Sequence, residues 1–254
     1  MANRFDFWRR ARAAGFHLLI CLAIAALAAG VVFGLWYPGI YRSASGGRDL
    51  FLLVTSVDIV LGPLLTFAVF NVAKGMRHLR RDLAIIGLIQ AAALGYGLHT
   101  VYAVRPVAMV FEVDRFRVIA STDVYLSELP KARPEYQTLP LTGPWLLGTR
   151  APNVGDEHTN AILLGINGID RANRPTFWQT YAESMPDALA KSRPVAKLLS
   201  HYAARSPELR AGLRDMKADE GSARFLPLMA RGDWVVVLDA AGQVLGTLRA
   251  DGFF

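Results

Sequence analysis

The sequence predicts a membrane protein in which three transmembrane α-helices precede an α+β domain with antiparallel hairpins. Mean hydropathy is positive, and three apolar runs each approach the length of about 20 residues that a spanning helix needs. Basic residues flank these runs. We therefore expect a basic head at 1–15, a transmembrane domain at 16–104 and an outer domain at 105–254.

The first apolar run, 16–37, follows a basic head and superficially resembles a signal peptide. It is longer than a typical signal-peptide core, and it ends without a small-x-small cleavage site. Trp36 and Tyr37 are instead typical of the membrane interface. We expect an uncleaved transmembrane helix, in which Cys21 is a small buried hydrophobic residue.

The second run, 50–70, reads LFLLVTSVDIVLGPLLTFAVF and contains Asp58. A carboxylate at membrane depth is costly and faces protein or a water-filled cavity rather than lipid. Asp58, Gly62 and Thr66 share one helix face, and Pro63 removes a backbone donor and predicts a kink. This helix is expected to pack between neighbours.

The third run covers 83–104, and Gln90 within it is expected to help helices pack. Small residues on one face let helices approach closely in lipid. Such faces occur in the first and third runs, at Gly30, Gly34, Gly87, Ala91 and Gly95.

His99 continues the small-residue face of the third run. Counted from the outer ends of the runs, Asp58 and His99 differ in depth by about 4–5 Å, so their side chains are expected to share a polar contact. Two roles stay open for the pair: locking the helices together, or receiving a partner helix or a proton. The candidate partner-binding residues are Asp58, Gly62, Pro63, Thr66 and His99.

Basic residues also predict the orientation. The head and the 71–82 loop carry four Lys or Arg each, whereas the 38–49 loop carries two. Cytoplasmic loops are the more basic ones, so the N-terminus is expected in the cytoplasm. Three crossings then put the domain at 105–254 outside, which in a bacterium is the periplasm. The membrane is then the inner membrane.

The distribution of charge disfavours nucleic-acid binding. Residues 1–104 carry a net charge of +6 and residues 105–254 only +1. A nucleic-acid-binding surface needs clustered basic residues on the globular part. The excess of positive charge therefore belongs to the membrane part.

Within the outer domain, hairpins are expected around Asp114-Arg115 and around 240–243. Residues 121–129 are expected to form a short helix, 130–152 an irregular proline-rich segment and 161–166 a strand. Three further helices are expected at 174–185, 186–204 and 207–218, the last capped by Ser206.

No catalytic or metal-binding pattern is found. Glu112 and Asp114 alternate along a strand, which puts both on its exposed face. The cluster Asp156-Glu157-His158 is expected in a solvated turn, and His158 and His201 lack metal-ligand spacing. We therefore expect no enzyme, no metal site and no cofactor.

Several motifs occur together in order: FHLLI and WYPG in the first run, VDIVLGPLLTFAVFN in the second, and DLAIIGLIQAAALGYGLHTVYAVRPVAMVFEVDRFRVI from the third into the outer domain. With these motifs residues 16–120 resemble the type IV pilin accessory proteins of the TfpX/TfpZ family. The ending FLPLMARGDWVVVLDAAGQVLG is similar too, whereas the middle, about 121–220, is not distinctive.

The resemblance implies a non-enzymatic accessory factor for type IV pilus assembly that acts on a cognate major pilin. Before assembly, pilins hold an apolar N-terminal helix in the bilayer and a globular head in the periplasm, so the resemblance implies a partner but no catalytic residue. The alternatives are a structural or scaffolding partner in the inner membrane, and a membrane enzyme acting on lipid or glycan at the outer face. Formation of a homo-oligomer stays open.

Overall fold

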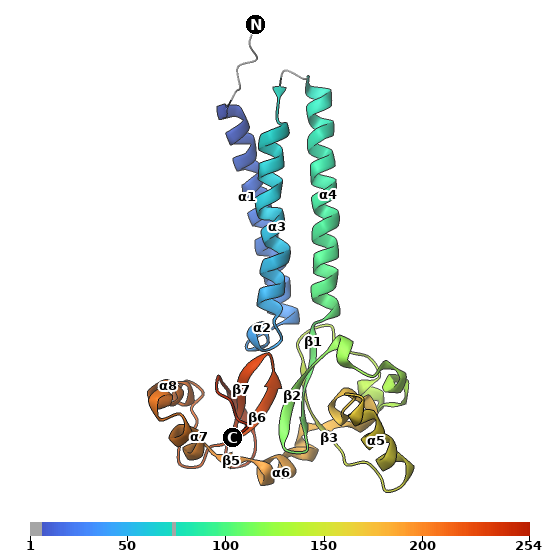
Figure 1. The fold of residues 1–254 in the computed structure, drawn as a ribbon, viewed down its shortest axis with the longest axis vertical. Coiled ribbons are helices and arrows are strands. Elements are labelled where there is room, and N and C mark those ends of the chain that lie inside the picture. Colours follow the sequence, from blue (N-terminus) through green and yellow to red (C-terminus); the bar gives the residue numbers. More distant parts are fainter. Residues whose placement is uncertain (1–6, 73–74) are drawn as a thin grey trace.

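The computed structural model describes residues 7–72 and 75–254. Three long helices stand side by side as a bundle, and a sheet-containing outer domain lies at one end of it (Figure 1). Each helix is long and apolar enough to cross a membrane. The fold class expected from the sequence, three such helices followed by an α+β domain, is confirmed.

The bundle helices extend beyond the apolar runs on their basic sides. Helix α1 covers Phe7–Val31 and continues as the π-helical segment η1, Val32–Trp36; α3 covers Gly47–Val69 and α4 covers Met76–Ala103. Arginine is a good helix former, so α1 and α4 continue into the basic flanks, whereas α3 ends at Val69. Residues 1–6 of the expected head lie outside the described residues.

Helix α3 packs against both α1 and α4. Gly62 of α3 faces the Gln90 amide of α4, and Gly97 of α4 faces Val54 of α3. Nothing lies within 4 Å of the Cβ position at four other glycines, Gly30, Gly34, Gly87 and Gly95. The expectation that these four pack the helices of this chain was wrong. Helix α4 turns Gly97 instead of Gly87 and Gly95 toward α3, and Gly30 and Gly34 are exposed.

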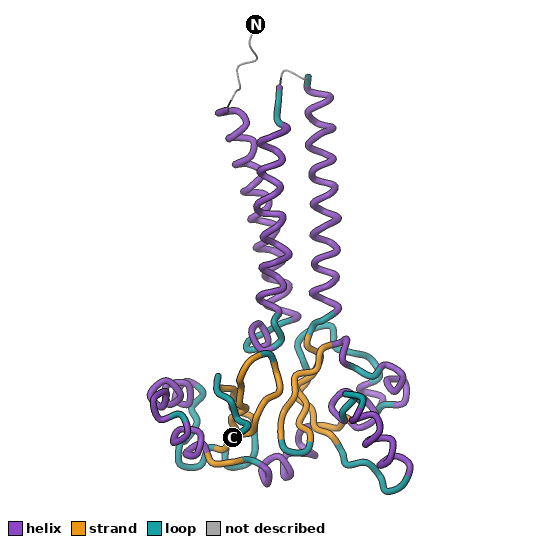
Figure 2. The backbone as a smooth tube through the Cα atoms, in the orientation of Figure 1, coloured by secondary structure: helices purple, strands orange, loops and turns teal. Residues whose placement is uncertain are grey.

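The outer domain is built on a mixed sheet of order β4-β3-β1-β2-β6-β7-β8, with β5 paired to β6. Pairs β1–β3 and β2–β6 are parallel, and the others are antiparallel. Figure 2 shows two groups of strands, which join only where Phe116-Arg117 pair with Leu228-Met229. The strands are β1 Pro106–Glu112, β2 Arg115–Ala120, β3 Trp145–Thr149, β4 Trp178–Thr180, β5 Arg193–Pro194, β6 Arg224–Ala230, β7 Gly232–Leu238 and β8 Val244–Leu248.

Four α-helices of the outer domain cover this sheet or extend from it. Helices α7 and α8 pack on the β6–β8 group, and α6 packs on the centre of the sheet, where Tyr181 meets Phe116. Trp178 and Val110 belong to a further core under β1 and β3. The helices are α5 Asp156–Ile166, α6 Tyr181–Lys191, α7 Val195–His201 and α8 Ser206–Asp215.

The two terminal hairpins of the outer domain were predicted correctly, but much of its middle was not. Residues 161–166 lie in helix α5 rather than in a strand, and the turn expected at 156–158 is the first turn of that helix. Trp145–Thr149, expected to be irregular, form strand β3 beside β1. Residues 121–129 form two short 3₁₀ segments instead of one helix.

The expected helix borders after residue 174 were also wrong. Helix α6 starts at Tyr181, because Thr180 and Glu183 form a capping box there, and it continues through Pro186. Ser206 is the first residue of α8 rather than its cap.

Polar contacts hold the outer ends of the bundle helices together and join them to the outer domain. The Tyr37 hydroxyl donates to the Val101 carbonyl at 2.9 Å, and the ring of Tyr37 lies against Gly47. The short helix α2, Tyr41–Ala44, accepts a backbone hydrogen bond of 2.6 Å from Arg231. The contacts of Tyr37 lie within the bundle, and the hydrogen bond from Arg231 joins the bundle to the outer domain.

Candidate functional site

The bundle contains a groove whose floor is α3 and whose walls are α1 and α4. The cavity measures about 200 Å³. Its surface is mostly aliphatic, and Asp58 lies among its lining residues. These are His17, Ile20, Cys21, Ile24 and Ala25 of α1, Thr55, Asp58 and Ile59 of α3, and Gly87, Gln90, Ala91 and Leu94 of α4.

Gln90 is the polar neighbour of Asp58 in the groove. Its Nε2 donates to the backbone carbonyl of Asp58 at 3.1 Å and lies 3.9 Å from Cys21 Sγ. Its Oε1 is buried and has no hydrogen-bond partner among the described residues. A buried acceptor without a donor is unfavourable. Because Oε1 lies against Gly62, this cost belongs to the α3–α4 contact, and Asp58 supplies the carboxylate among the lining residues.

Two further candidate residues contact neighbouring helices of this chain and are not open to a partner. Thr66 is buried and lies 2.5 Å from Nδ1 of His17 on α1, and Gly62 is buried against Gln90. Pro63 is half-buried in a helix that continues through it. Asp58 is thus the candidate residue that opens into the groove.

The expected contact between Asp58 and His99 was wrong. His99 is exposed and does not line the groove. It lies nine residues from Gln90 along α4, about 13.5 Å at the helical rise. The depth argument failed because α3 begins at Gly47, so Asp58 lies deeper than a count from residue 50 suggests.

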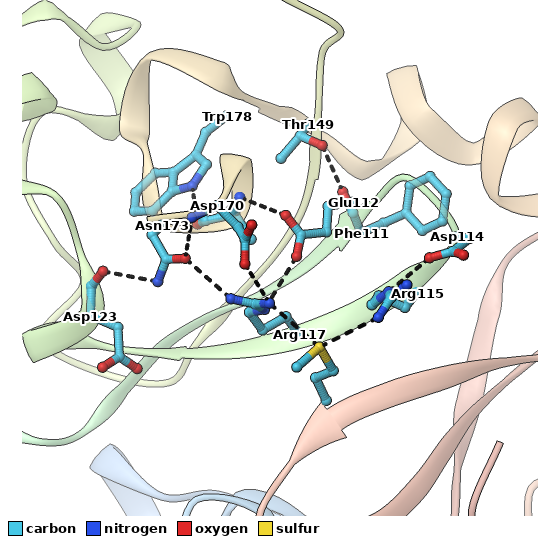
Figure 3. Close-up of polar contacts among 12 residues, drawn as sticks. Phe111, Glu112, Asp114, Arg115, Arg117, Asp123, Thr149, Asp170, Asn173 and Trp178 are labelled. Carbon is cyan, nitrogen blue, oxygen red and sulfur yellow. Dashed lines mark hydrogen bonds and ion pairs between the residues drawn. The ribbon is translucent and has the colours of Figure 1, made fainter. Parts of the chain in front are cut away.

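The outer domain has a second polar site, at the free end of the β1–β2 hairpin (Figure 3). Glu112 accepts from the backbone N–H of Ala172 at 3.0 Å and pairs with Nε of Arg117 at 3.2 Å. Arg117 also pairs with Asp170 at 2.7 Å. Glu112 is 5% exposed, so its expected place on an exposed strand face was wrong.

Burial raises the pKa of Glu112, and the Arg117 charge and the Ala172 N–H oppose this rise. Strand β1 is buried along its whole length, which a period-two pattern does not reveal. Among the described residues, no group of three or more His, Cys, Asp or Glu side chains is arranged to hold a metal ion.

A third set of contacts anchors helix α5 beside this site. Arg150 and the backbone N–H of Asn153 bind Glu157, and these hydrogen bonds lower the pKa of Glu157 to about 2. A lowered carboxyl pKa gives stability that is present above the unfolded pKa of about 4.3 and is lost as the pH falls toward the folded value.

We expect Glu157→Gln to flatten the acid dependence of stability. The partly exposed pair is worth about 1 kcal/mol after solvent screening. Between pH 6 and pH 2.5, Tm of the wild-type chain in detergent should therefore fall about 3 °C more than that of the variant. Equal falls would show that the ion pair does not stabilise the fold.

The fold and the groove define a class of protein: a membrane-associated chain with three apolar helices, a groove between them suited to an apolar side chain, and an outer α+β domain. The family described as "Fimbrial assembly protein FimB" matches residues 5–46. No solved structure matches the chain.

Curated relatives from Dichelobacter nodosus extend the match to the whole chain. The fimbrial assembly protein of serogroup I is 34% identical over 254 residues, 99% of both chains, and that of serogroup E1 is 32% identical over the same shares. The protein of serogroups C1 and C2 is 41% identical over 130 residues, 51% of this chain and 99% of that protein. The chain belongs to the fimbrial assembly protein family, as its resemblance to pilus accessory proteins implied.

Proposed function

We propose that this protein is a non-enzymatic assembly factor for type IV fimbriae that holds the apolar helix of the major pilin in the inner membrane. The helix lies along the groove between α1 and α4, and the outer domain meets the globular part of the pilin in the periplasm. One observation carries this proposal: an apolar groove at membrane depth is open to a neighbouring helix and contains Asp58.

The size and chemistry of the groove indicate which side chains of a partner helix it binds. An apolar cavity of about 150 Å³ admits benzene, so about 200 Å³ has room for one large side chain of a helix lying against it. The Asp58 carboxylate accepts hydrogen bonds. The partner helix therefore presents an apolar side chain and, at the same depth, a hydrogen-bond donor.

The charges flanking the helices support the orientation. The ends of α1 and α4 that lie far from the outer domain carry the arginines, and basic ends remain in the cytoplasm. The outer domain is then periplasmic, on the side where the heads of unassembled pilins lie.

We expect Gly87→Leu to block the groove and to reduce surface fimbriae at least tenfold. Gly87 lines the groove, and nothing lies within 4 Å of its Cβ position, so leucine fits without disturbing the bundle and fills the space that the pilin helix needs. Fimbriae would be counted by electron microscopy and pilin by immunoblotting of sheared surface fractions.

Gly95→Leu is the matched control. Gly95 has the same free space but does not line the groove, so this variant should assemble fimbriae normally. If both variants assemble normally at wild-type protein levels, the groove does not hold the pilin helix.

A structural partner role is the second candidate. The faces around Gly30, Gly34 and Gly95 lie free of the other helices of the chain, and small-residue faces suit association with another helix. A second copy of this chain, or another assembly protein, would then be the partner. Loss of fimbriae on Gly95→Leu but not on Gly87→Leu would favour this role.

A further inference from the structure

The outer domain contains a cleft far from the bundle. A cavity of about 500 Å³ separates the tip of the β1–β2 hairpin from helix α5. Its floor includes Arg117 and Arg171, Val113 lies on its rim, and Ile162 of α5 lies on its wall. The hairpin tip and α5 are at the end of the outer domain opposite the bundle (Figure 1), so the bilayer that holds the bundle does not cover them.

Helix α5 carries exposed apolar side chains, and Ile162 among them lines the cleft. None of its residues is buried, and its apolar side chains Ile162, Leu163 and Ile166 are 52%, 53% and 79% exposed. Val154, just before the helix, is fully exposed. Contiguous exposed apolar side chains mark sites of interaction with other proteins.

The floor of the cleft has an excess of positive charge. Its two carboxylates, Glu112 and Asp170, both pair with Arg117, and Arg115 pairs with Asp114 at 2.7 Å. Arg171 forms no ion pair within 4 Å among the described residues, and its guanidinium donates to the Arg150 carbonyl at 3.4 Å. Burial raises the pKa of Glu112, and the charge of Arg171 helps to oppose this rise without a direct ion pair. One arginine at the floor thus remains available for an incoming carboxylate.

The rim of the cleft is strained. Val113 has a φ of 55°, which is unfavourable for a β-branched residue, and its side chain is 56% exposed. Such strain is found where the surrounding structure imposes it, often at binding sites. Here the buried strand β1 and the Arg115–Asp114 pair fix the hairpin tip.

We propose that this cleft binds a segment of the pilin head in which an acidic side chain stands next to apolar ones. The carboxylate pairs with Arg171, and the apolar side chains pack on Val113 and Ile162. Charge complementarity selects such a segment, because the cleft combines the guanidinium of Arg171 with the apolar side chains of Val113 and Ile162. This inference rests on the proposed function, which supplies the partner, and adds the surface and the chemistry of its recognition.

Crosslinking in cells tests the cleft directly. A photoreactive amino acid at Ala161, which lines the cleft, should crosslink to co-expressed pilin, whereas one at Arg210 on α8 should not. Adding Arg171→Glu should reduce the Ala161 crosslink at least tenfold, and Arg171→Lys should retain most of it. Ile162→Ser, which replaces an exposed side chain and leaves folding intact, should reduce the crosslink as well.

The outcomes separate the two proposals. If a photoreactive group in the membrane groove captures pilin but the one at Ala161 does not, the cleft inference is wrong and the proposed function stands. If neither position captures pilin, both are wrong. A crosslink at Ala161 that is unchanged by Arg171→Glu and Ile162→Ser would also overturn the cleft as the recognition site.

Discussion

Replacing Asp58 by lysine is expected to abolish surface fimbriae while leaving the protein at its normal level in the membrane. The new ammonium would lie in an apolar groove in place of the carboxylate that accepts a donor from the partner helix. When the partner helix covers the groove, the ammonium loses its access to water without gaining a counter-ion, which costs several kcal/mol, and each 1.4 kcal/mol is a tenfold loss of binding. Fimbriae should therefore fall more than tenfold.

Conservative variants separate charge from folding. Asp58→Glu keeps the carboxylate and should assemble fimbriae, whereas Asp58→Asn keeps the shape and should show an intermediate loss. A topology reporter and immunoblotting verify that each variant is inserted normally. Normal fimbriation by Asp58→Lys at wild-type abundance would exclude a role for this carboxylate in holding the pilin.

Gly62→Val is expected to destabilise the bundle itself. A Cβ at Gly62 would overlap the amide of Gln90, and this amide donates to the Asp58 carbonyl at 3.1 Å. Inserting methyl groups into a packed interface costs about 1–3 kcal/mol. We expect a lower thermal midpoint in detergent and a lower steady-state level in cells.

Gly30→Val is the matched control, because nothing lies within 4 Å of its Cβ position. It should leave the thermal midpoint within about 1 °C of the wild type, since an exposed substitution away from any packed contact changes stability little. Equal destabilisation by both variants would mean that the α3–α4 contact at Gly62 is not specific.

The sequence predicts the three long helices because an apolar run of about 20 residues indicates a transmembrane helix. It predicts the terminal hairpins because alternating apolar residues flank short turns. The apolar run 161–166 was assigned to a strand, because periodicity alone does not distinguish a short strand from part of a helix. Strand β3 was missed because its five residues lie in a proline-rich segment.

The candidate site was predicted only in part. An isolated carboxylate in an apolar run identifies Asp58 from sequence alone. Its neighbours depend on how each helix is rotated about its axis, which side-chain packing determines. Gln90 was therefore predicted only as a packing residue, and His17 was not predicted to line the groove. His99 was assigned to the wrong face of α4.

Site-specific photocrosslinking within the membrane tests the central claim most directly. Ala91 lines the groove, whereas Ile89, about 3 Å away along the helix axis, is exposed and does not line it. A photoreactive amino acid at Ala91 should crosslink to the apolar helix of co-expressed pilin, and one at Ile89 should not. Equal capture from both positions, or capture only from Ile89, would contradict a pilin-binding groove.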